Sequence, residues 1–441
     1  MNGIAGIMLE LGYKVTGSDL KAGVATERLT NLGATCYVGH APENVNGAEM
    51  IVVSTAIAAD NVELLAAQER GLPVMHRGEM LAMLMDRQKG IAVAGSHGKT
   101  STSAMLSLVA EKNKLDPTIV IGGELSDIGG NAKLGQGVYL IAEADESDGS
   151  FLKLNPSIEI ITNIEDDHLD FYKSVDNIIA AFQSFTARLP QGGVLIACLD
   201  SDTVVKILRD YEGGRLTYAV GRDDADFIMR NIRLDQNNTS GEVYFHGDKM
   251  GVLKLSVPGL HNLSNALATV AAASLLGITF DDAAKALLGF RGAGRRFQYI
   301  GEVDGIRVVD DYAHHPSEIR ATLKAARQMK EGRVVSVFQP HRYSRTNLLQ
   351  EQFGAAFSDA DMIIVSDIYS AGEKPIEGVS AGSIITAIER NEGREVIYLP
   401  TRSDIVNYLS ENARQGDLIL TMGAGDIWRA GVDLVKKLKE N

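Results

Sequence analysis

The sequence is poor in cysteine, and its two cysteines, Cys36 and Cys198, lie far apart without metal-ligand spacing. We therefore expect neither a disulfide framework nor a zinc knuckle, and a reducing cytoplasm fits this composition. Basic residues are also too few to dominate the surface, because 43 Lys and Arg against 57 Asp and Glu leave a formal net charge of −14. Surfaces that bind nucleic acid or anionic membranes carry excess positive charge, so neither partner is expected.

Long apolar runs are missing as well. The strongest one, residues 266–278, is shorter than the roughly 20 residues that cross a bilayer. The start of the chain has no basic segment ahead of an apolar one, so it does not predict a signal peptide. We expect a cytoplasmic protein, monomeric or homodimeric, that acts on small molecules. The negative net charge does not exclude an anionic ligand. Charges are screened over about 8 Å at physiological ionic strength, so basic groups close to a ligand influence its binding more than the net charge does.

Short β-rich runs alternate with helical patterns along most of the chain. This alternation predicts an α/β fold of right-handed βαβ units with parallel sheets. The length suggests three compact units. We predict a Rossmann-like domain at 1–88, a central P-loop ATPase-like α/β domain at 89–292 and a C-terminal Rossmann-like α/β domain at 293–441. Residues 226–257 read as an antiparallel insert on the central domain, with a turn at 237–241.

The first predicted domain opens on a helical pattern with no strand or glycine turn ahead of it. In a dinucleotide-type fold, a first strand and its Gly-rich turn precede that helix, and an acidic residue follows about 20 positions after the turn. Asp19 ends the first strand pattern in this chain. We therefore expect that one strand and its phosphate loop are missing, and that a longer reading frame encodes them.

The most specific motif is GSHGKTS, which lies between a strand pattern and a helix pattern. Gly95 and Gly98 let backbone amides approach phosphate oxygens, Lys99 supplies positive charge, and Thr100 offers a hydroxyl to Mg²⁺. The positive end of the following helix points at the same place. Val93 stands where the full pattern has glycine, so this is the shorter version of the motif. An ordinary turn with a surface lysine is the alternative, but the motif in this context predicts ATP binding.

Acidic side chains follow two apolar strand patterns. The first group is Glu143, Asp145, Glu146 and Asp148, and the second is Asp166 and Asp167 ahead of His168. Crowded carboxylates repel one another, and a bound cation relieves this repulsion; Mg²⁺ prefers such oxygen ligands. A solvated acidic loop, or a histidine in a turn, explains either group alone. Together with the glycine-lysine loop, the two groups favour a metal site.

Basic and aromatic side chains cluster in the third predicted domain. The guanidinium group of arginine can donate two hydrogen bonds to one carboxylate, and it supplies the local positive charge that an anionic ligand needs. For each group, the alternative is a solvated loop. The pattern at Gly423 and Gly425 is equally consistent with an ordinary turn that binds nothing. The cluster contains Arg295, Arg296, Asp310, Asp311, Tyr312, His314, His315, His341, Arg342 and Arg345.

Taken together, these motifs resemble the Mur ligases of bacterial peptidoglycan synthesis along nearly the whole chain. The motifs occur in the order GSHGKTS, EADESD, NIEDDHLD, GLHNLSNALA, GAGRRF, DDYAHHPSE, QPHRYSRT and GAGDIW. The resemblance is strongest to the branch that joins L-alanine to UDP-N-acetylmuramate. It implies that the first domain holds the UDP-sugar, the second holds ATP and Mg²⁺, and the third brings the amino acid by closing on them. The sugar carboxylate would be activated as an acyl phosphate.

The resemblance also assigns residues. It implies that Lys99 contacts the ATP phosphates and Thr100 the metal, in a loop of Gly95, Ser96, His97, Gly98, Lys99, Thr100 and Ser101. Metal ligands would be Glu143 and His168. Adenine contacts would be His261, Asn262 and Asn265, while Arg296 and Asp311 would reach the nucleotide from the third domain. Residues near the incoming alanine would be Tyr312, His314, His341, Arg342 and Arg345. Contacts to the UDP-sugar would be Ser18, Asp19, Ser54, His76 and Arg77.

Within this assignment, His314 or His341 would accept the proton of the alanine amine or position the alanine. The helix after His168 lacks the lysine that other family members carbamylate, a further similarity to the alanine-adding branch.

Three other readings stay open. A recycling ligase attaches a whole tripeptide to the same sugar, although the arginines and histidine of HRYSR favour a single alanine. The missing glycine loop suggests a non-catalytic nucleotide-sugar binding protein. The first domain alone suggests a dinucleotide oxidoreductase, against which the P-loop and the incomplete glycine fingerprint weigh.

Overall fold

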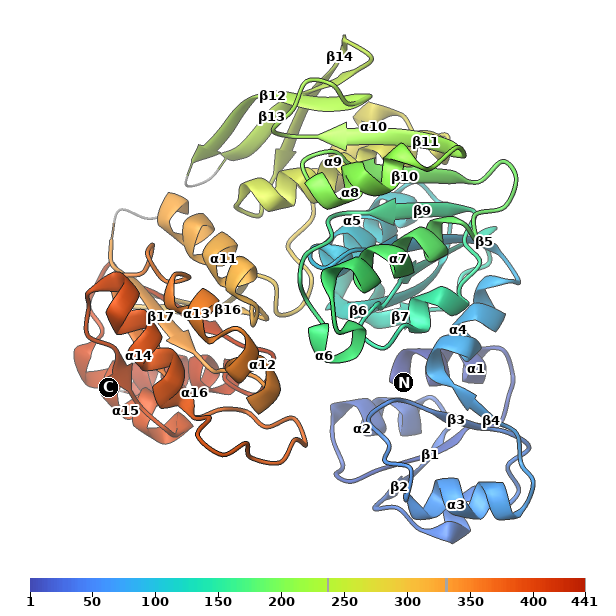
Figure 1. Ribbon diagram of the computed structural model, residues 1–441, viewed down its shortest axis with the longest axis horizontal. Coiled ribbons are helices and arrows are strands. Elements are labelled where there is room, and N and C mark those ends of the chain that lie inside the picture. Colours follow the sequence, from blue (N-terminus) through green and yellow to red (C-terminus); the bar gives the residue numbers. More distant parts are fainter. Residues whose placement is uncertain (236–237, 330–331, 441) are drawn as a thin grey trace. The chain divides into compact units, whose positions relative to one another are not determined.

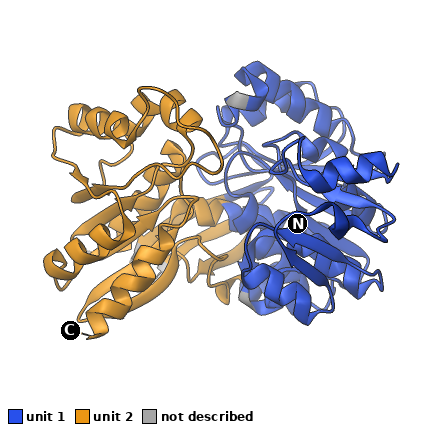
Figure 2. Cartoon of the chain, turned by 90° about the horizontal axis from the view of Figure 1, so that it is seen from below, with its two compact units in different colours: residues 1–228, 244–248, 265–286 blue, residues 229–243, 249–264, 287–441 orange. Residues whose placement is uncertain are grey.

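The computed structural model describes residues 1–235, 238–329 and 332–440 (Figure 1). Packing separates the chain into two compact units (Figure 2). Unit 1 contains residues 1–228, 244–248 and 265–286, and unit 2 contains the other described residues. The turn expected at 237–241 falls partly outside the described residues.

The N-terminal part of unit 1 holds two separate parallel strand pairs, β1 with β2 and β3 with β4. Helix starts here are set by side chains: Asn61 Oδ1 accepts hydrogen bonds from the Glu63 and Leu64 amides, and His76 caps the next helix. The expected additional strand stays a prediction. The elements are α1 (Asn2–Glu10), β1 (Thr16–Asp19), α2 (Val24–Asn31), β2 (Thr35–Val38), η1 (Pro42–Val45), β3 (Ile51–Val53), α3 (Val62–Glu69), β4 (Val74–His76) and α4 (Arg77–Met85).

The rest of unit 1 is built on a larger sheet with the strand order β11-β10-β9-β5-β8-β6-β7. Neighbouring strands are parallel except β7, which runs antiparallel to β6. The strands are β5 (Lys89–Ala94), β6 (Thr118–Leu125), β7 (Gly130–Lys133), β8 (Tyr139–Glu143), β9 (Ile158–Ile161), β10 (Val194–Cys198) and β11 (Gly214–Ala219).

Helices cover both faces of this sheet, which explains why its central strands are continuous apolar runs. Helix α5 packs against β5, β6 and β8. On the other face, Phe182, Phe185 and Ile207 join the core that includes Leu195 and Ala197. The helices are α5 (Lys99–Lys112), η2 (Ser126–Ile128), η3 (Ser150–Lys153), α6 (Leu169–Tyr172), α7 (Val175–Thr186), α8 (Asp202–Arg209), α9 (Leu260–Leu275) and α10 (Phe280–Leu288).

The expected antiparallel insert consists of β12 (Phe227–Asp235), β13 (Asn238–Phe245) and β14 (Asp248–Leu255), in the order β14-β13-β12. Strand β12 pairs with β11 through Phe227 and Ile228 and then runs on into unit 2.

Unit 2 contains a second doubly wound sheet with the order β15-β16-β20-β17-β18-β19. Only its first strand, among the described residues, runs antiparallel to its neighbour. The strands are β15 (Gln298–Val303), β16 (Ile306–Asp311), β17 (Val334–Phe338), β18 (Met362–Val365), β19 (Ile397–Tyr398) and β20 (Leu418–Met422).

Successive residues of the strands in unit 2 enter two different cores. Phe338 and Leu420 pack with α11, α13 and α14, whereas Val337 and Ile419 pack with α15 and α16. This alternation is what a strand buried on both faces requires. The helices are α11 (Pro316–Met329), α12 (Tyr343–Leu348), α13 (Gln350–Gly354), α14 (Ala381–Glu392), α15 (Arg402–Asn412) and α16 (Trp428–Glu440).

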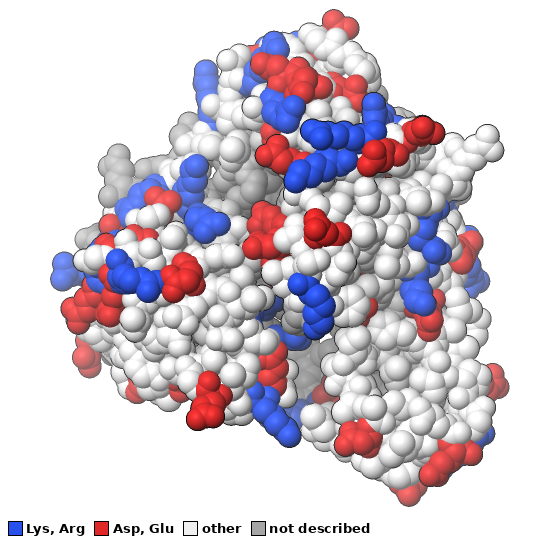
Figure 3. Space-filling model, viewed as in Figure 1, with Lys and Arg blue, Asp and Glu red and all other residues white. Residues whose placement is uncertain are grey.

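The surface shown in Figure 3 mixes acidic and basic side chains rather than gathering one sign in a single patch. Within the described part of the chain, no helix has both the length and the apolar character that crossing a bilayer demands.

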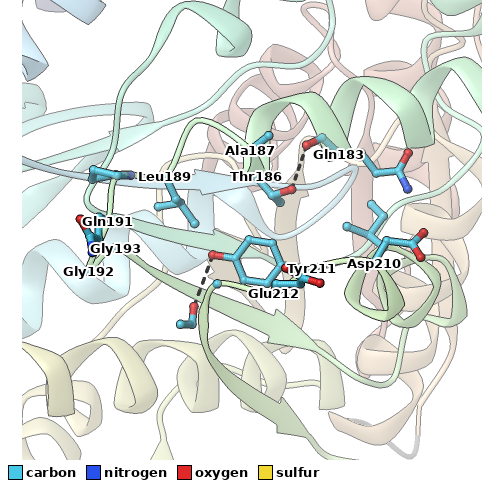
Figure 4. A pocket seen from close by; sticks show the side chains of 14 residues that line it. Gln183, Thr186, Ala187, Leu189, Gln191, Gly192, Gly193, Asp210, Tyr211 and Glu212 are labelled. Atoms are coloured by element: carbon cyan, nitrogen blue, oxygen red, sulfur yellow. Dashed lines mark hydrogen bonds between the residues drawn. The ribbon is translucent and has the colours of Figure 1, made fainter.

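A cavity of about 640 Å³ opens where β10 and β11 begin, at the edge of the sheet opposite the ends that carry the sequence motifs. The ends of α7 and α8 line it, and the Tyr211 ring lies across its middle (Figure 4). Tyr211 Oη donates to the Gly214 carbonyl at 3.4 Å. No sequence motif points to this cavity.

Close to Tyr211, Glu159 lies fully buried within β9, and neither carboxylate oxygen has a hydrogen-bond partner among the described residues. Burial raises the pKa of Glu159 well above 4.5. The folded protein therefore keeps the proton at pH values where the unfolded chain has lost it, and stability falls as pH rises above about 4.5.

We expect Glu159→Gln, which cannot ionise, to remove this pH dependence. Up to the raised pKa, the stability difference between variant and wild type should grow with pH by at most about 1.4 kcal/mol per pH unit. Urea unfolding at pH 5, 6, 7 and 8 measures this difference. Parallel curves for the two proteins would show that Glu159 does not hold its proton.

Candidate functional site

The GSHGKTS loop joins β5 to α5 at the carboxyl end of the sheet in unit 1. Gly95 and Gly98 have φ values of 131° and 84°, which side chains other than glycine rarely adopt. A Cβ on Gly95 would lie 2.2 Å from Thr162 Oγ1, and one on Gly98 would lie 2.5 Å from Asn265 Oδ1. Both positions therefore require glycine, for reasons of conformation and of space.

The loop is fastened to the residues that follow β9. The His97 amide donates to Asn163 Oδ1 at 2.9 Å, and Asn163 Nδ2 donates back to the His97 carbonyl at 3.0 Å. The Ser96 amide donates to the Asn163 carbonyl, and Ser96 Oγ accepts from the Glu165 amide at 2.8 Å. Sequence reasoning missed this brace, because Asn163 entered it only as the first residue of NIEDDHLD and not as a partner of the phosphate loop.

Lys99 and Thr100 each meet a carboxylate of the Glu143–Asp148 segment. Lys99 Nζ donates to Glu146 Oε1 at 2.8 Å and to the carbonyls of Gly95 and Ser96, at 2.5 Å and 3.1 Å. Thr100 Oγ1 donates to Glu143 Oε2 at 2.9 Å. Burial works against the charge on Lys99, but Glu146 and Glu143 outweigh it and raise the lysine pKa.

His168, the residue just before α6, approaches the same carboxylates. Its Nε2 lies 3.6 Å from Glu146 Oε1 and 3.5 Å from Asp167 Oδ2. The two predicted metal ligands thus have different partners, with Glu143 at Thr100 and His168 at Glu146. Glu146 Oε2 is buried with no hydrogen-bond partner in the described chain, and burial raises the pKa of Glu146 to about 7. This group of side chains is rich in oxygen atoms that can bind a metal, and one of these atoms has no hydrogen-bond partner in the described chain. Such a group fits a hard cation such as Mg²⁺.

Arg77 connects the start of α4 to the same acidic segment. Arg77 Nη2 pairs with Asp145 and lies 3.7 Å from Asp148 Oδ2, which is 3.6 Å from His76 Nε2. Burial works against the charge of Asp145, but bonds from Ser147 and the charges of Lys99 and Arg77 outweigh it and lower its pKa to about 2. A cavity of about 300 Å³ lies here, lined by Arg77, Gly122, Glu143, Asp145 and residues of α1.

The other predicted sugar contacts lie at the ends of the N-terminal strands. Ser18 Oγ donates to Glu63 Oε2 at 2.6 Å and lies 2.9 Å from His40 Nδ1. Asp19 is exposed at the end of β1. Ser54 follows β3, and its carbonyl accepts from the Ile57 amide. The structure thus groups His76 and Arg77 with the acidic segment, and places Ser18, Asp19 and Ser54 at the ends of β1 and β3.

The three predicted adenine contacts lie on α9. Asn265 belongs to unit 1 and lies against Gly98, as described above. His261 and Asn262 belong to unit 2, where Asn262 Nδ2 donates to the Pro258 carbonyl at 2.7 Å.

In unit 2 the predicted alanine contacts form one cluster. The Tyr312 and His314 rings are 5.3 Å apart, and the His314 and His341 rings are 5.9 Å apart. Arg345 Nη1 lies 3.3 Å from His341 Nδ1. Tyr369, which sequence reasoning missed because no motif contains it, stacks on His341 at 5.7 Å.

Burial, then the charges of His314 and the neighbouring arginines, lowers the pKa of His341 to about 3. The imidazole of His341 is therefore neutral at neutral pH. Arg342 is more exposed than its neighbours and lies 3.9 Å from Glu373.

Two arginines and two aspartates brace this cluster. Arg295 pairs with Asp310 at 3.0 Å and donates to the carbonyls of Gly423 and Gly425. Arg296 Nη1 lies 3.5 Å from Glu318, and its guanidinium lies 5.2 Å from the centre of the Tyr312 ring. Burial raises the pKa of Asp311 to about 6, although its oxygens accept from the Phe297 and Ala313 amides.

Comparison with known proteins covers the whole chain. The sequence matches the Mur ligase family, catalytic domain over residues 1–101, the Mur ligase middle domain over 93–273 and the Mur ligase, glutamate ligase domain over 295–425. A protein of Pelotomaculum thermopropionicum named UDP-N-acetylmuramate–L-alanine ligase is 66% identical over 441 residues, which are 100% of this chain and 96% of that protein.

Solved structures agree with these matches. The UDP-N-acetylmuramate–alanine ligase of Thermotoga maritima is 27% identical with a TM-score of 0.85, over 100% of this chain and 96% of that one. The murein peptide ligase of Psychrobacter arcticus is 25% identical with a TM-score of 0.75, over 100% of this chain and 97% of that one.

Proposed function

This chain belongs to the Mur ligase family, and on that premise we propose that it joins L-alanine to the carboxylate of UDP-N-acetylmuramate, with cleavage of ATP to ADP and phosphate, in peptidoglycan precursor synthesis. The observation that carries the proposal is the 66% identity, over the full chain, to a relative named for this reaction. The use of ATP supports a cytoplasmic location. We propose domain boundaries near residues 88 and 292, which the three family matches support.

The chemistry has two steps. In the first, a sugar carboxylate oxygen attacks the γ-phosphorus, the bond to the bridging oxygen breaks, and ADP leaves an acyl phosphate behind. In the second, the neutral amine of alanine attacks the acyl carbon, phosphate leaves, and the amine loses a proton. Lys99 would stabilise the charge that develops on the transferring phosphoryl group, mainly through its position and charge.

We propose that Thr100, Glu143 and His168 hold Mg²⁺, supported by their oxygen-rich surroundings and the unsatisfied Glu146 Oε2. The ion would offset the negative charge of the phosphates. We propose that Ser18, Asp19, Ser54, His76 and Arg77 contact the UDP-sugar, that His261, Asn262 and Asn265 contact adenine, and that Arg296 and Asp311 reach the nucleotide.

For alanine, we propose that Arg345 and Arg342 bind the carboxylate, and that Tyr312, His314 and His341 surround the amine. The low pKa of His341 makes it a weak proton acceptor, so we assign it a positioning role and leave proton acceptance to His314.

A phosphate-release assay with each reactant left out in turn tests the function. We expect release only when ATP, Mg²⁺, UDP-N-acetylmuramate and L-alanine are all present, with a product heavier than the sugar nucleotide by one alanine residue in the mass spectrum. Faster turnover with the tripeptide than with alanine would instead identify a recycling ligase. Binding of the sugar nucleotide without any ADP formation would identify a binding protein, and a nicotinamide absorbance change would point to an oxidoreductase.

A further inference from the structure

Four charged side chains run in a line through unit 1, from the predicted sugar contacts to the P-loop. Arg77 pairs with Asp145, the next charged residue in the chain is Glu146, and Glu146 pairs with Lys99 at 2.8 Å. Asp145 and Glu146 are adjacent in sequence, so a shift of one backbone position moves both carboxylates. The two cations are therefore held by one short piece of backbone.

Hydrogen bonds hold this piece of backbone in place. Tyr172 Oη donates to the Glu146 carbonyl at 2.6 Å, and the Ser147 amide donates to Asp145 Oδ1 at 3.0 Å. The side chain of Glu146 is 3% exposed and that of Lys99 is 12% exposed. An ion pair this far from solvent is weakly screened, so its geometry strongly determines where the ammonium lies.

Each of these four charged side chains is paired with one of opposite sign. Burial disfavours the charge on Lys99, and the carboxylates of Glu146, Glu143 and Asp145 favour it, in that order. Lys99 and Arg77 both act on the charge of Asp145, and the direct ion pairs are Arg77 with Asp145 and Lys99 with Glu146.

The ammonium of Lys99 is the group that ATP phosphates need. Its three N–H groups also reach the carbonyls of Gly95 and Ser96, so a phosphate oxygen can replace one carbonyl while Glu146 keeps its contact.

We propose that Glu146 is a positioning residue that sets Lys99 for phosphoryl transfer, and that Arg77 protects this setting by holding Asp145. The inference rests on the proposed function and deepens it. Glu146 touches no reacting atom in this account and acts through Lys99. Because the Glu146 carboxylate places a negative charge beside the phosphates, losing it should not weaken nucleotide binding, whereas losing the alignment of Lys99 should slow the chemical step.

Glu146→Gln, which keeps the shape and removes the charge, tests the first half. We expect kcat to fall at least about tenfold while the Kd for ADP, measured by calorimetry, stays equal to wild type or becomes smaller. Glu146→Asp keeps the charge and should recover part of kcat. A melting temperature within a few degrees of wild type shows that the fold is retained. The matched control is Glu111→Gln, which removes a Glu–Lys pair on the same helix α5 with Lys133 as partner.

A wild-type kcat in Glu146→Gln would overturn the positioning role. A fall in kcat with an equally large loss of ADP affinity would also overturn the positioning role, because disruption of the loop would lower both nucleotide affinity and turnover. If the wild-type protein binds ADP but does not join alanine, the proposed function fails, and the ADP measurements below still test the inference.

A double-mutant cycle tests the second half. Arg77→Gln leaves Asp145 uncompensated next to the phosphate site, so we expect the Kd for ADP to rise at least about threefold. In the Glu146→Gln background, Lys99 is available to Asp145, and the same change should alter the Kd less than about twofold. Multiplicative effects of the two substitutions would show that the pairs are independent and would overturn the second half. Arg70→Gln, on the exposed end of α3, is the control for removing an arginine.

Discussion

Replacing Lys99 with alanine is expected to reduce ATP turnover by about a hundredfold to a thousandfold. Its ammonium is the buried cation of the GSHGKTS loop, bonded to two loop carbonyls and to Glu146. Removing it leaves the phosphates without their cation and Glu146 as a buried, uncompensated carboxylate. A group that stabilises developing charge in such a site contributes on the order of a hundredfold to a thousandfold in rate. The phosphate-release assay with saturating sugar nucleotide and alanine measures this loss.

The matched control for this experiment is Lys112→Ala. Lys112 lies at the other end of α5, is 57% exposed, and pairs with Asp127 at the surface. Exposed pairs contribute little, so this variant should behave as wild type. If Lys99→Ala turned over ATP at the wild-type rate, the loop would not be the phosphate site, and the proposed function would lose its main structural support.

Arg345→Ala is expected to raise the KM for L-alanine while leaving ADP affinity unchanged. Arg345 belongs to the cluster in unit 2, where its Nη1 lies 3.3 Å from His341 Nδ1. A hydrogen bond between an arginine and a carboxylate contributes about 1.5 to 3 kcal/mol, which corresponds to a KM increase of about 10-fold to 150-fold. Arg390→Ala is the control, because Arg390 is exposed on α14 and pairs only with the exposed Glu351 among the contacts described.

Replacing His341 and replacing His314 should have different effects in the phosphate-release assay. His341→Ala should raise the KM for alanine without changing the shape of the pH profile between pH 5 and 9, because the pKa of His341 is about 3. His314→Ala should lower kcat if His314 takes the proton. Wild-type KM and kcat for alanine in both variants would contradict any role for these rings.

The sequence-based prediction of the fold succeeded where a strand has an uninterrupted apolar run. The alternating β-rich runs on which the prediction was based include those that form β5, β8, β9 and β10, and β16, β17, β18, β19 and β20 in the last domain. Strands without such a run, or with glycines inside it, were missed. Strand β2 is mostly exposed and has no apolar pattern, and the interior of β6 contains Gly122 and Gly123, which weaken any strand signal. The family prediction was confirmed by the three domain matches.

For the site, sequence reasoning identified the groups of residues but not the pairs within them. The acidic segment was recognised as one cluster, yet the partner of each carboxylate depends on how β8 lies beside β5, where Val93 is opposite Glu143. That register cannot be derived from spacing along the chain. The assignment of Glu143 and His168 as metal ligands stays a prediction, and so do the contacts to sugar, adenine and alanine.

The brace between the GSHGKTS loop and Asn163 has a thermodynamic consequence. Its hydrogen bonds fix the backbone of Ser96 and His97 without help from a ligand. A nucleotide that arrives at this loop therefore restricts little additional backbone motion. Most of the favourable free energy of its phosphate contacts is then retained as affinity rather than offset by lost conformational entropy.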